Sequence, residues 1–169
     1  MARVVVERLS KAHDRGTFDC GNADLNDFLK TKARKHAEQN VSVTWVAVRE
    51  GESRTLGYVT LTMGSVAFAD ASPEITKGLP RYPLPVLHVG RLGTDRSVQG
   101  KGIGSLLLRF AAEQAIDASR SMGVFGMELA AIDQAAYDYY VRRGFKPLTE
   151  DGMRLYLPIA HLRASDARG

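Results

Sequence analysis

A glycine-rich segment joins an apolar stretch that is predicted to be a strand to an apolar stretch that is predicted to be a helix. The segment reads Gln99-Gly100-Lys101-Gly102-Ile103-Gly104. A glycine turn that opens a helix leaves backbone N–H groups without carbonyl partners, and these donors, with the positive end of the helix dipole, favour a bound anion. Glycine also has no side chain to keep a phosphate away from the main chain. The segment therefore predicts a phosphate site at the start of the helix.

Glycine spacing alone does not decide between a phosphate site and an ordinary tight turn. Two common nucleotide-binding motifs are excluded, because no Gly-Lys-Ser/Thr of a P-loop follows and the third glycine of a Rossmann motif is out of register. The remaining pattern, Gln-x-x-Gly-x-Gly, resembles the pyrophosphate-binding signature of the GNAT superfamily of acyl-CoA-dependent N-acetyltransferases. The resemblance implies acetyl-CoA as the cosubstrate and the six residues from Gln99 to Gly104 as part of its binding site.

A second motif strengthens this resemblance. In GNAT proteins a strand leads into a helix that carries Asn-x-x-Ala-x-x-x-Tyr and ends in Gly-Phe. Four residues of this chain stand in register with that pattern: Ala136, Tyr140, Gly144 and Phe145. Asp133 stands where asparagine is usual. The resemblance implies that Asp133 and Ala136 contact the cosubstrate, and it extends from about Val4 to Pro158.

Acetyl transfer needs a polarised thioester carbonyl and a proton for the departing thiolate. The resemblance implies that the backbone N–H near Leu92 polarises the carbonyl, which is often the largest single catalytic contribution. It also implies that Leu92 and Thr94 pair with the pantetheine arm like an added strand, with Gly93 between them offering no side chain to obstruct it. The family register selects Tyr140 as the acid, because a phenol is protonated at neutral pH. A purely structural aromatic residue is the alternative, since Tyr137 and Tyr139 stand on the same segment.

The base is less well defined by the sequence. His88 precedes the glycine segment, near the position where some GNAT enzymes carry a glutamate base, and histidine titrates near neutral pH. An interior histidine with a structural hydrogen bond is an equal alternative, and Glu128 and Asp133 are weaker candidates for the base. The other histidines have no partner pattern, and no metal-ligand spacing is present.

Several further segments resemble the GNAT toxins of type II toxin–antitoxin systems. They read Phe18-x-Cys20-Gly21-x-x-x-Leu25-x-x-Phe28-Leu29, Val41-Ser42-x-Thr44, Pro85-Val86, Arg91-Leu92-x-x-Asp95 and Leu157-Pro158. Gly93 and Thr94 depart mildly from the usual Ala-Val. The resemblance implies acetylation of the α-amino group of an aminoacyl-tRNA, inhibition of translation and a ribbon-helix-helix antitoxin as partner. It is also compatible with a homodimer.

Basic residues agree with an RNA substrate. The net charge is +4, and the candidates for phosphate contacts are Lys30, Lys32, Arg34, Lys35, Arg91, Arg142 and Arg143. An ordinary solvated helix face is the alternative explanation. The function also has two alternatives. One is a GNAT acetyltransferase of a small-molecule or protein amine, and the other is a non-catalytic acetyl-CoA-binding regulator.

The elements that position these residues follow from periodicity and turn signals. We expect a strand from Val4 and a helix after an Asn22 cap, with Leu25, Phe28, Leu29 and Ala33 on one face. Strands are expected over 41–49 and 56–68, a long loop over 69–84, and a strand to Asp95. A helix over 103–119, a strand over 124–132, a helix over 134–143 and a strand over 153–157 complete the prediction. This order predicts an α/β fold, and the resemblance implies the GNAT fold, with a mixed, mainly antiparallel sheet, splayed fourth and fifth strands and flanking helices.

Length and composition are typical of a globular protein with one domain. We expect a single N-acetyltransferase domain over residues 1–160 and a polar tail over 161–169. Cys20 is the one cysteine, which excludes an internal disulfide and fits a reducing compartment. No leader and no apolar run long enough for a membrane span are present in the sequence. A cytoplasmic location and no contact with membranes are therefore expected.

Overall fold

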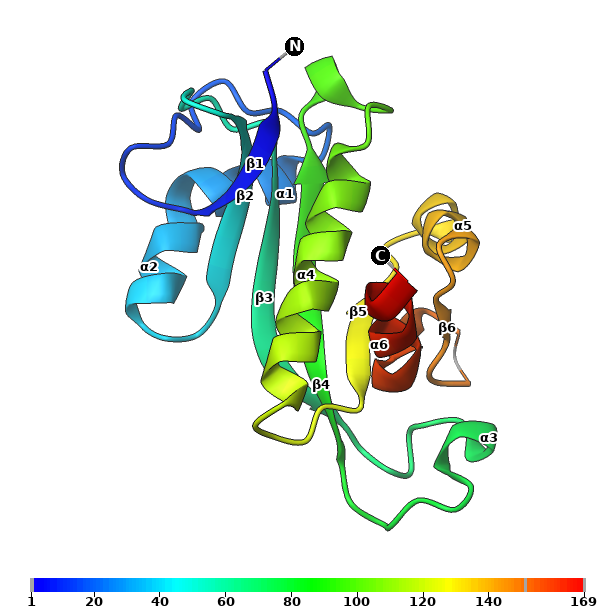
Figure 1. Ribbon diagram of the computed structural model, residues 1–169. Coiled ribbons are helices and arrows are strands. Elements are labelled where there is room, and N and C mark those ends of the chain that lie inside the picture. Colours follow the sequence, from blue (N-terminus) through cyan, green and yellow to red (C-terminus); the bar gives the residue numbers. More distant parts are fainter. Residues whose placement is uncertain (1, 151, 169) are drawn as a thin grey trace. The chain divides into compact units, whose positions relative to one another are not determined.

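A computed structural model describes residues 2–150 and 152–168. Figure 1 shows the arrangement of its elements within the chain. The strands are β1 (Val4–Arg8), β2 (Val43–Arg49), β3 (Gly57–Val66), β4 (Leu84–Thr94), β5 (Gly126–Ala130), β6 (Lys146–Pro147) and β7 (Arg154–Pro158). The helices are α1 (Ala23–Asp27), the π-helix η1 (Phe28–Lys32), α2 (Ala33–Glu38), α3 (Pro73–Thr76), the 3-10 helix η2 (Arg96–Val98), α4 (Ile103–Ser119), α5 (Gln134–Arg142) and α6 (Ile159–Arg168).

The strands form a seven-stranded sheet in the order β1-β2-β3-β4-β5-β7-β6. The β1–β2, β2–β3, β5–β7 and β6–β7 pairs are antiparallel, whereas β4 and β5 pair in parallel at Val86–His88 and Gly126–Glu128. This confirms the mixed, mainly antiparallel sheet of the predicted fold class. The chain divides into two compact units, residues 1–62 with 89–111 and residues 63–88 with 112–169.

In the first unit, a helix cap and a stripe of apolar side chains hold the N-terminal helices in place. The Asn22 side chain accepts a hydrogen bond from the Leu25 N–H at 3.0 Å, as the sequence predicted. Phe28, Leu29 and Ala33 are buried and pack in a cluster whose other buried members are Phe18, Val46, Val48 and Tyr58. The π-helical turn η1, within this stripe, was not predicted. Phe28 and Leu29 are the buried residues of this turn.

The other face of β2 in this unit packs on α4. The rings of Trp45 and Phe110 lie with their centroids 4.6 Å apart, and Leu107 and Ala111 of α4 are fully buried. Because side chains alternate between the two faces of a strand, β2 packs on the N-terminal helices with one face and on α4 with the other. The predicted strand from 41 begins in the structure at Val43, because Val41 is exposed and lies outside the ladder.

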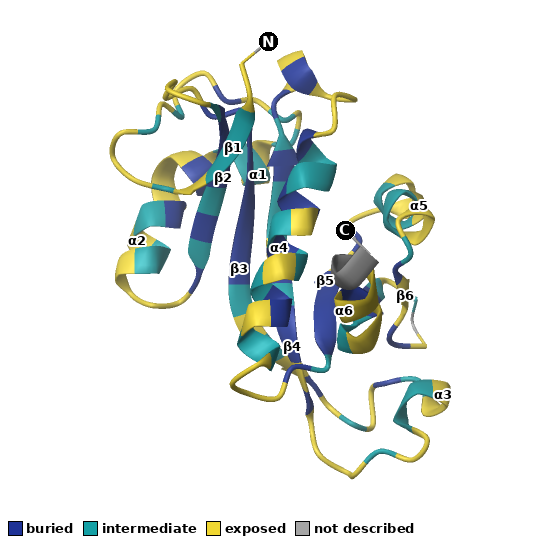
Figure 2. Ribbon diagram, viewed as in Figure 1, coloured by how far each residue is buried: buried dark blue, intermediate teal, exposed yellow. Residues whose placement is uncertain are grey.

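In the second unit, β5 is buried along most of its length (Figure 2). A buried cluster of Val66, Ala71, Leu84, Val86, Leu148 and Tyr156 covers part of the sheet. Three elements of this unit were not predicted: α3 within the expected loop, the short strand β6, and α6. Residues 161–168, expected as a polar tail, belong to α6, where Leu162 is buried and anchors the helix. The expected single domain over residues 1–160 stays a prediction.

Asp95 is a buried carboxylate where β4 ends and the glycine turn begins. It accepts hydrogen bonds from the backbone N–H groups of Asp19 and Ser97, both at 3.0 Å, and from the Ser97 hydroxyl at 2.6 Å. Arg54 Nη2 lies 3.4 Å from the same carboxylate. Burial raises the pKa of Asp95, but these hydrogen bonds more than offset the effect and hold the pKa below its ordinary value. One side chain thus ties three distant segments of the first unit together.

We expect Asp95→Asn to lower the free energy of unfolding by roughly 1–3 kcal/mol at neutral pH, because a neutral amide replaces a buried anion that accepts several hydrogen bonds. The folded pKa lies below the unfolded one, so this stabilisation is present above an unfolded pKa of about 4 and is lost as the pH falls through the folded pKa. Urea unfolding should show that the difference in free energy of unfolding between the unmodified protein and Asp95→Asn becomes smaller below that pH. Exposed Glu50→Gln is the control, and a difference that stays constant at acidic pH would contradict this role.

Candidate functional site

The glycine turn of the first unit has the backbone that the sequence predicted. Gly100 and Gly102 have φ angles of +77° and +86°, which favour glycine. A Cβ placed on Gly102 would meet no atom within 4 Å among those described, so open space lies beside the main chain. The Leu106 N–H donates to the Gly102 carbonyl at 3.0 Å, and α4 begins at Ile103, whose side chain is buried. The turn therefore presents the N-terminus of a long helix beside open space, which suits a phosphate.

Gln99 connects the turn to two neighbouring segments. Its Nε2 donates to the carbonyl of Thr94 at 3.1 Å and to that of Cys20 at 3.3 Å. Lys101, in contrast, is exposed. In the structure Gln99 holds the end of β4 against the segment before α1, and its contact with a cosubstrate stays a prediction.

The end of β4 carries Leu92, Gly93 and Thr94. Gly93 is buried, and a Cβ on it would lie 3.3 Å from Cys20 Sγ and 3.4 Å from Tyr58 Cε1. The Tyr58 hydroxyl in turn donates to the Leu25 carbonyl at 2.7 Å. Gly93 thus has a packing role that the sequence did not reveal. Leu92 and Thr94 are only partly buried.

In the second unit, α5 carries the predicted acid. Asp133 caps this helix, and its side chain accepts from the Ala136 N–H at 2.8 Å. The ring of Tyr140 meets those of Tyr139 and Phe145 edge-on, with centroids 5.3 and 5.5 Å away. Burial, with a smaller contribution from Tyr139, raises the pKa of Tyr140 to about 12. The phenol therefore carries its proton at neutral pH, as a proton donor must.

His88 contacts Glu128 in the same unit, and Glu128 in turn contacts Arg154. The Nδ1 of His88 lies 2.6 Å from Glu128 Oε2, and Arg154 Nε donates to Glu128 Oε1 at 2.9 Å. The sequence analysis treated Glu128 only as a weaker base and did not single out Arg154. The available signal was one charged residue in the middle of an apolar strand, at Glu128 in β5.

The basic residues differ in their partners. Lys32 lies 3.2 Å from Asp27, and Arg34 lies 3.9 Å from Glu38. For exposed Lys30 and Lys35, the described part of the chain places no carboxylate within 4.0 Å. The guanidinium of Arg91 lies over the Phe28 ring at 3.7 Å.

The guanidinium of Arg143 stacks on the Tyr139 ring, with 3.3 Å to the centroid. Arg142 is exposed on the same helix. These two arginines belong to the second unit, whereas Lys30, Lys35 and Arg91 belong to the first.

The predicted site residues thus fall into two groups, each placed within its own unit. The glycine turn, Gln99 and the end of β4 belong to the first unit, and His88, Asp133, Ala136 and Tyr140 belong to the second. Across residues 2–150 and 152–168, no three His, Cys, Asp or Glu side chains are arranged to hold a metal ion. No helix in that described part is long and apolar enough to cross a membrane.

Comparisons with known proteins agree with this chemistry. A tRNA-acetylating toxin from Mycobacterium tuberculosis is 35% identical over 157 residues, which cover 93% of each protein. A structure of AtaT complexed with acetyl-methionyl-tRNAfMet is similar with a TM-score of 0.89 and 29% identity, covering 97% of this chain and 99% of that one. A tyrosine-to-phenylalanine variant of AtaT, bound to acetyl-CoA and the C-terminus of the antitoxin AtaR, has a TM-score of 0.83 and 28% identity over 96% and 98% of the two chains.

The family itself is shown by a sequence profile as well as by these relatives. Residues 40–147 match the profile described as "Acetyltransferase (GNAT) domain". That range includes the glycine turn, the end of β4 and all of α5. The chain therefore belongs to the GNAT family of acetyltransferases.

Proposed function

We propose that this protein transfers the acetyl group of acetyl-CoA to the α-amino group of an aminoacyl-tRNA and so inhibits translation. The observation that carries the proposal is the relationship, over 93% of the chain, to a tRNA-acetylating toxin. The glycine turn and a tyrosine that keeps its proton are the parts that such a reaction needs. A cytoplasmic location is part of the proposal, because the proposed substrate takes part in translation.

Acetyl-CoA is the cosubstrate, and most of the residues that we propose to hold it belong to the first unit. The pyrophosphate binds at the turn formed by Gly100 and Gly102, where the main chain borders open space. The backbone at Leu92 and Thr94 pairs with the pantetheine arm, and the Leu92 N–H polarises the thioester carbonyl. Asp133 and Ala136, at the start of α5, complete the proposed binding residues.

The reaction is a direct transfer. The neutral amine attacks the thioester carbonyl carbon, and the resulting oxyanion is stabilised by the Leu92 N–H. The carbon–sulfur bond then breaks, and the thiolate takes the proton of the Tyr140 hydroxyl. His88 receives the proton that the amine loses, directly or through one water molecule.

The tRNA surface is proposed in the first unit. Lys30 and Lys35 are exposed, and a groove of about 500 Å³ beside α2 is lined by Arg8, Lys11 and Arg34. Such cations bind phosphates by releasing counterions from the nucleic acid. AtaT has been solved with a charged tRNA and with its antitoxin. An antitoxin is therefore the protein partner that we propose for this chain.

The direct test is transfer of labelled acetyl groups from acetyl-CoA to bulk aminoacyl-tRNA. Free amino acids and lysine-containing peptides serve as competing acceptors. We expect label in the tRNA fraction only. Rapid acetylation of the free amines, with uncharged and charged tRNA equally inert, would identify a small-molecule or protein acetyltransferase instead.

Gly102→Leu should weaken acetyl-CoA binding at least about tenfold, because a side chain would occupy the space next to the main-chain donors. Gly51→Leu is the matched control, since Gly51 has a similar φ of +81° and equally open surroundings. Both variants carry the same backbone strain, so calorimetry isolates the effect of position. Equal affinities in the two variants would show that the turn does not hold the pyrophosphate.

Tyr140→Phe removes only the hydroxyl and should lower kcat by ~10²–10⁴ with little change in KM for acetyl-CoA. Tyr139→Phe, whose ring lies beside Tyr140 on the same helix, is the control and should keep most activity. Steady-state kinetics on aminoacyl-tRNA gives both numbers. Expression of the unmodified chain without an antitoxin should halt growth, and Tyr140→Phe should relieve the arrest. The opposite ranking of the two variants would move the acid to Tyr139.

Reversing Lys30 and Lys35 to glutamate should raise KM for aminoacyl-tRNA and leave acetyl-CoA binding unchanged. The logarithm of the affinity for tRNA falls as the logarithm of the salt concentration rises, and each lost phosphate contact makes this slope less steep by ~0.9. Loss of both lysines should therefore make the slope less steep by about 2. Lys77→Glu combined with Lys146→Glu, two exposed positions of the second unit, makes the same change in net charge and is the control. An unchanged salt slope would assign these lysines to an ordinary solvated surface.

A further inference from the structure

Three ionisable side chains lie on one face of neighbouring strands of the second unit. His88 on β4 pairs in register with Glu128 on β5, and Arg154 on β7 pairs with Ala130, two residues beyond Glu128. Alternate residues of a strand share a face, so these three side chains meet. The two contacts, 2.6 Å from His88 to Glu128 and 2.9 Å from Arg154 to Glu128, place the carboxylate in the middle.

The carboxylate is buried more completely than either partner. The side chain of Glu128 is 1% exposed, whereas those of His88 and Arg154 are 34% and 33% exposed. Burial raises the pKa of Glu128, but the hydrogen bonds from His88 and Arg154 more than offset it and hold the pKa below its ordinary value. Glu128 is therefore an anion at neutral pH, with each oxygen bonded to a different cation or donor.

This arrangement is a costly way to stabilise a sheet. A buried ion pair is often no more stabilising than apolar side chains of similar volume, because both charges lose their hydration. Neighbouring positions on the same face of the sheet are filled by Val86 and Tyr156, which pack in the buried cluster of this unit. A charged group that packing does not require is a candidate for a functional role.

The geometry fixes the protonation of the imidazole. An ionised carboxylate only accepts hydrogen bonds, so in neutral His88 the proton must be on Nδ1, which faces Glu128. Nε2 then has a free lone pair and is the nitrogen that can take a proton. Arg154 donates to the other oxygen and so restrains the carboxylate from rotating or gaining a proton.

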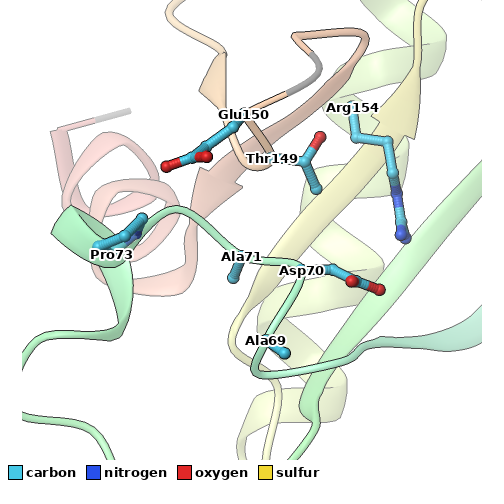
Figure 3. Close-up of a pocket in the computed structure, with 7 residues that line it drawn as sticks. All are labelled: Ala69, Asp70, Ala71, Pro73, Thr149, Glu150 and Arg154. Atoms are coloured by element: carbon cyan, nitrogen blue, oxygen red, sulfur yellow. The ribbon is translucent and has the colours of Figure 1, made fainter.

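Arg154 also connects this cluster to the surface. It lines a pocket of about 490 Å³ together with Asp70, Thr149 and Glu150. Figure 3 shows the Arg154 side chain reaching past this pocket along the sheet, with the Asp70 carboxylate on the same side. The cluster is thus open to solvent at Arg154 and at His88 and closed at Glu128.

We infer that Glu128 and Arg154 are positioning residues that hold His88 in its Nδ1–H tautomer, so that Nε2 is the atom that deprotonates the acceptor amine. The inference rests on the proposed function, and specifically on His88 as the base. In this step the amine nitrogen, which carries a positive charge once it has attacked the carbonyl carbon, loses an N–H bond, and an Nε2–H bond forms. The imidazolium is stabilised by Glu128 and later returns its proton to water.

The first test is independent of activity. Proton–nitrogen correlation NMR of histidine-labelled protein, titrated to alkaline pH, reports which nitrogen of neutral His88 carries the proton. We expect Nδ1–H in the unmodified chain. In Glu128→Gln the amide can donate to Nδ1, so the proton should move to Nε2. An Nε2–H tautomer in the unmodified chain, or no change in Glu128→Gln, would overturn the inference.

A second variant covers the case in which Glu128→Gln does not fold. Arg154→Met removes the guanidinium from the buried carboxylate and leaves the contact with His88 in place. The same NMR experiment near neutral pH should then show protons on both nitrogens of His88 in a larger fraction of molecules. An unchanged His88 spectrum in Arg154→Met would equally contradict the inference.

Kinetics tests whether the arrangement serves the reaction. Glu128→Gln should lower kcat on aminoacyl-tRNA ~10–100-fold, the usual effect of losing a side chain that orients a histidine, with KM for acetyl-CoA unchanged. In a His88→Ala background the same change should have no further effect on kcat. Exposed Glu74→Gln is the control and should leave kcat unchanged. The inference would be overturned if Glu128→Gln lowered kcat equally with and without His88, or if His88→Ala kept full activity. Neither result would contradict the proposed acetylation of aminoacyl-tRNA.

Discussion

The buried carboxylate of Asp95 is the constraint on which the proposed cosubstrate site of the first unit depends. It accepts hydrogen bonds from the segment before α1 and from the turn after β4, and it lies beside Arg54 of the hairpin between β2 and β3. These segments are far apart in sequence, and a single anion fixes their meeting point. The main chain then enters the glycine turn in one conformation, and α4 begins with its N-terminus beside open space. Backbone donors can act as a binding site only when such a constraint removes their freedom to move.

The second unit also buries a carboxylate, but with a different consequence. Asp95 accepts hydrogen bonds from the N–H and hydroxyl of Ser97 in its own turn and from the N–H of Asp19 in a distant segment. Glu128 is bonded to two side chains that can change partners or protons, and both are partly exposed. The first arrangement therefore fixes the conformation of a turn, whereas we infer that the second fixes the tautomer of His88. Tyr140, the acid that we propose, is a third case, because burial raises the pKa of its phenol further above neutral pH.

Local patterns in the sequence account for the parts of the site that are local. The glycine turn, the helix over 103–119, the Asn22 cap and the position of Tyr140 on a short helix all follow from residues close together in the chain, and the structure agrees with them. The residues that the sequence missed act across long separations. The packing of Gly93 against Cys20 and Tyr58 depends on how β4 meets the segment before α1. The pairing of Arg154 with Glu128 depends on the register of β5 and β7, which periodicity does not determine. Helix α6 was missed because its composition is polar and a single buried leucine anchors it.

The chemical position of the transferred acetyl group tests the central claim most directly. Aminoacyl-tRNA treated with the protein and acetyl-CoA is digested with ribonuclease, and the released 3′-terminal adenosine is analysed by mass spectrometry. The account predicts N-acetyl-aminoacyl-adenosine, with the acetyl group on the α-nitrogen of the amino acid. Acetyl groups found on a nucleobase, or only on free amines and proteins while the aminoacyl-adenosine keeps its original mass, would contradict it.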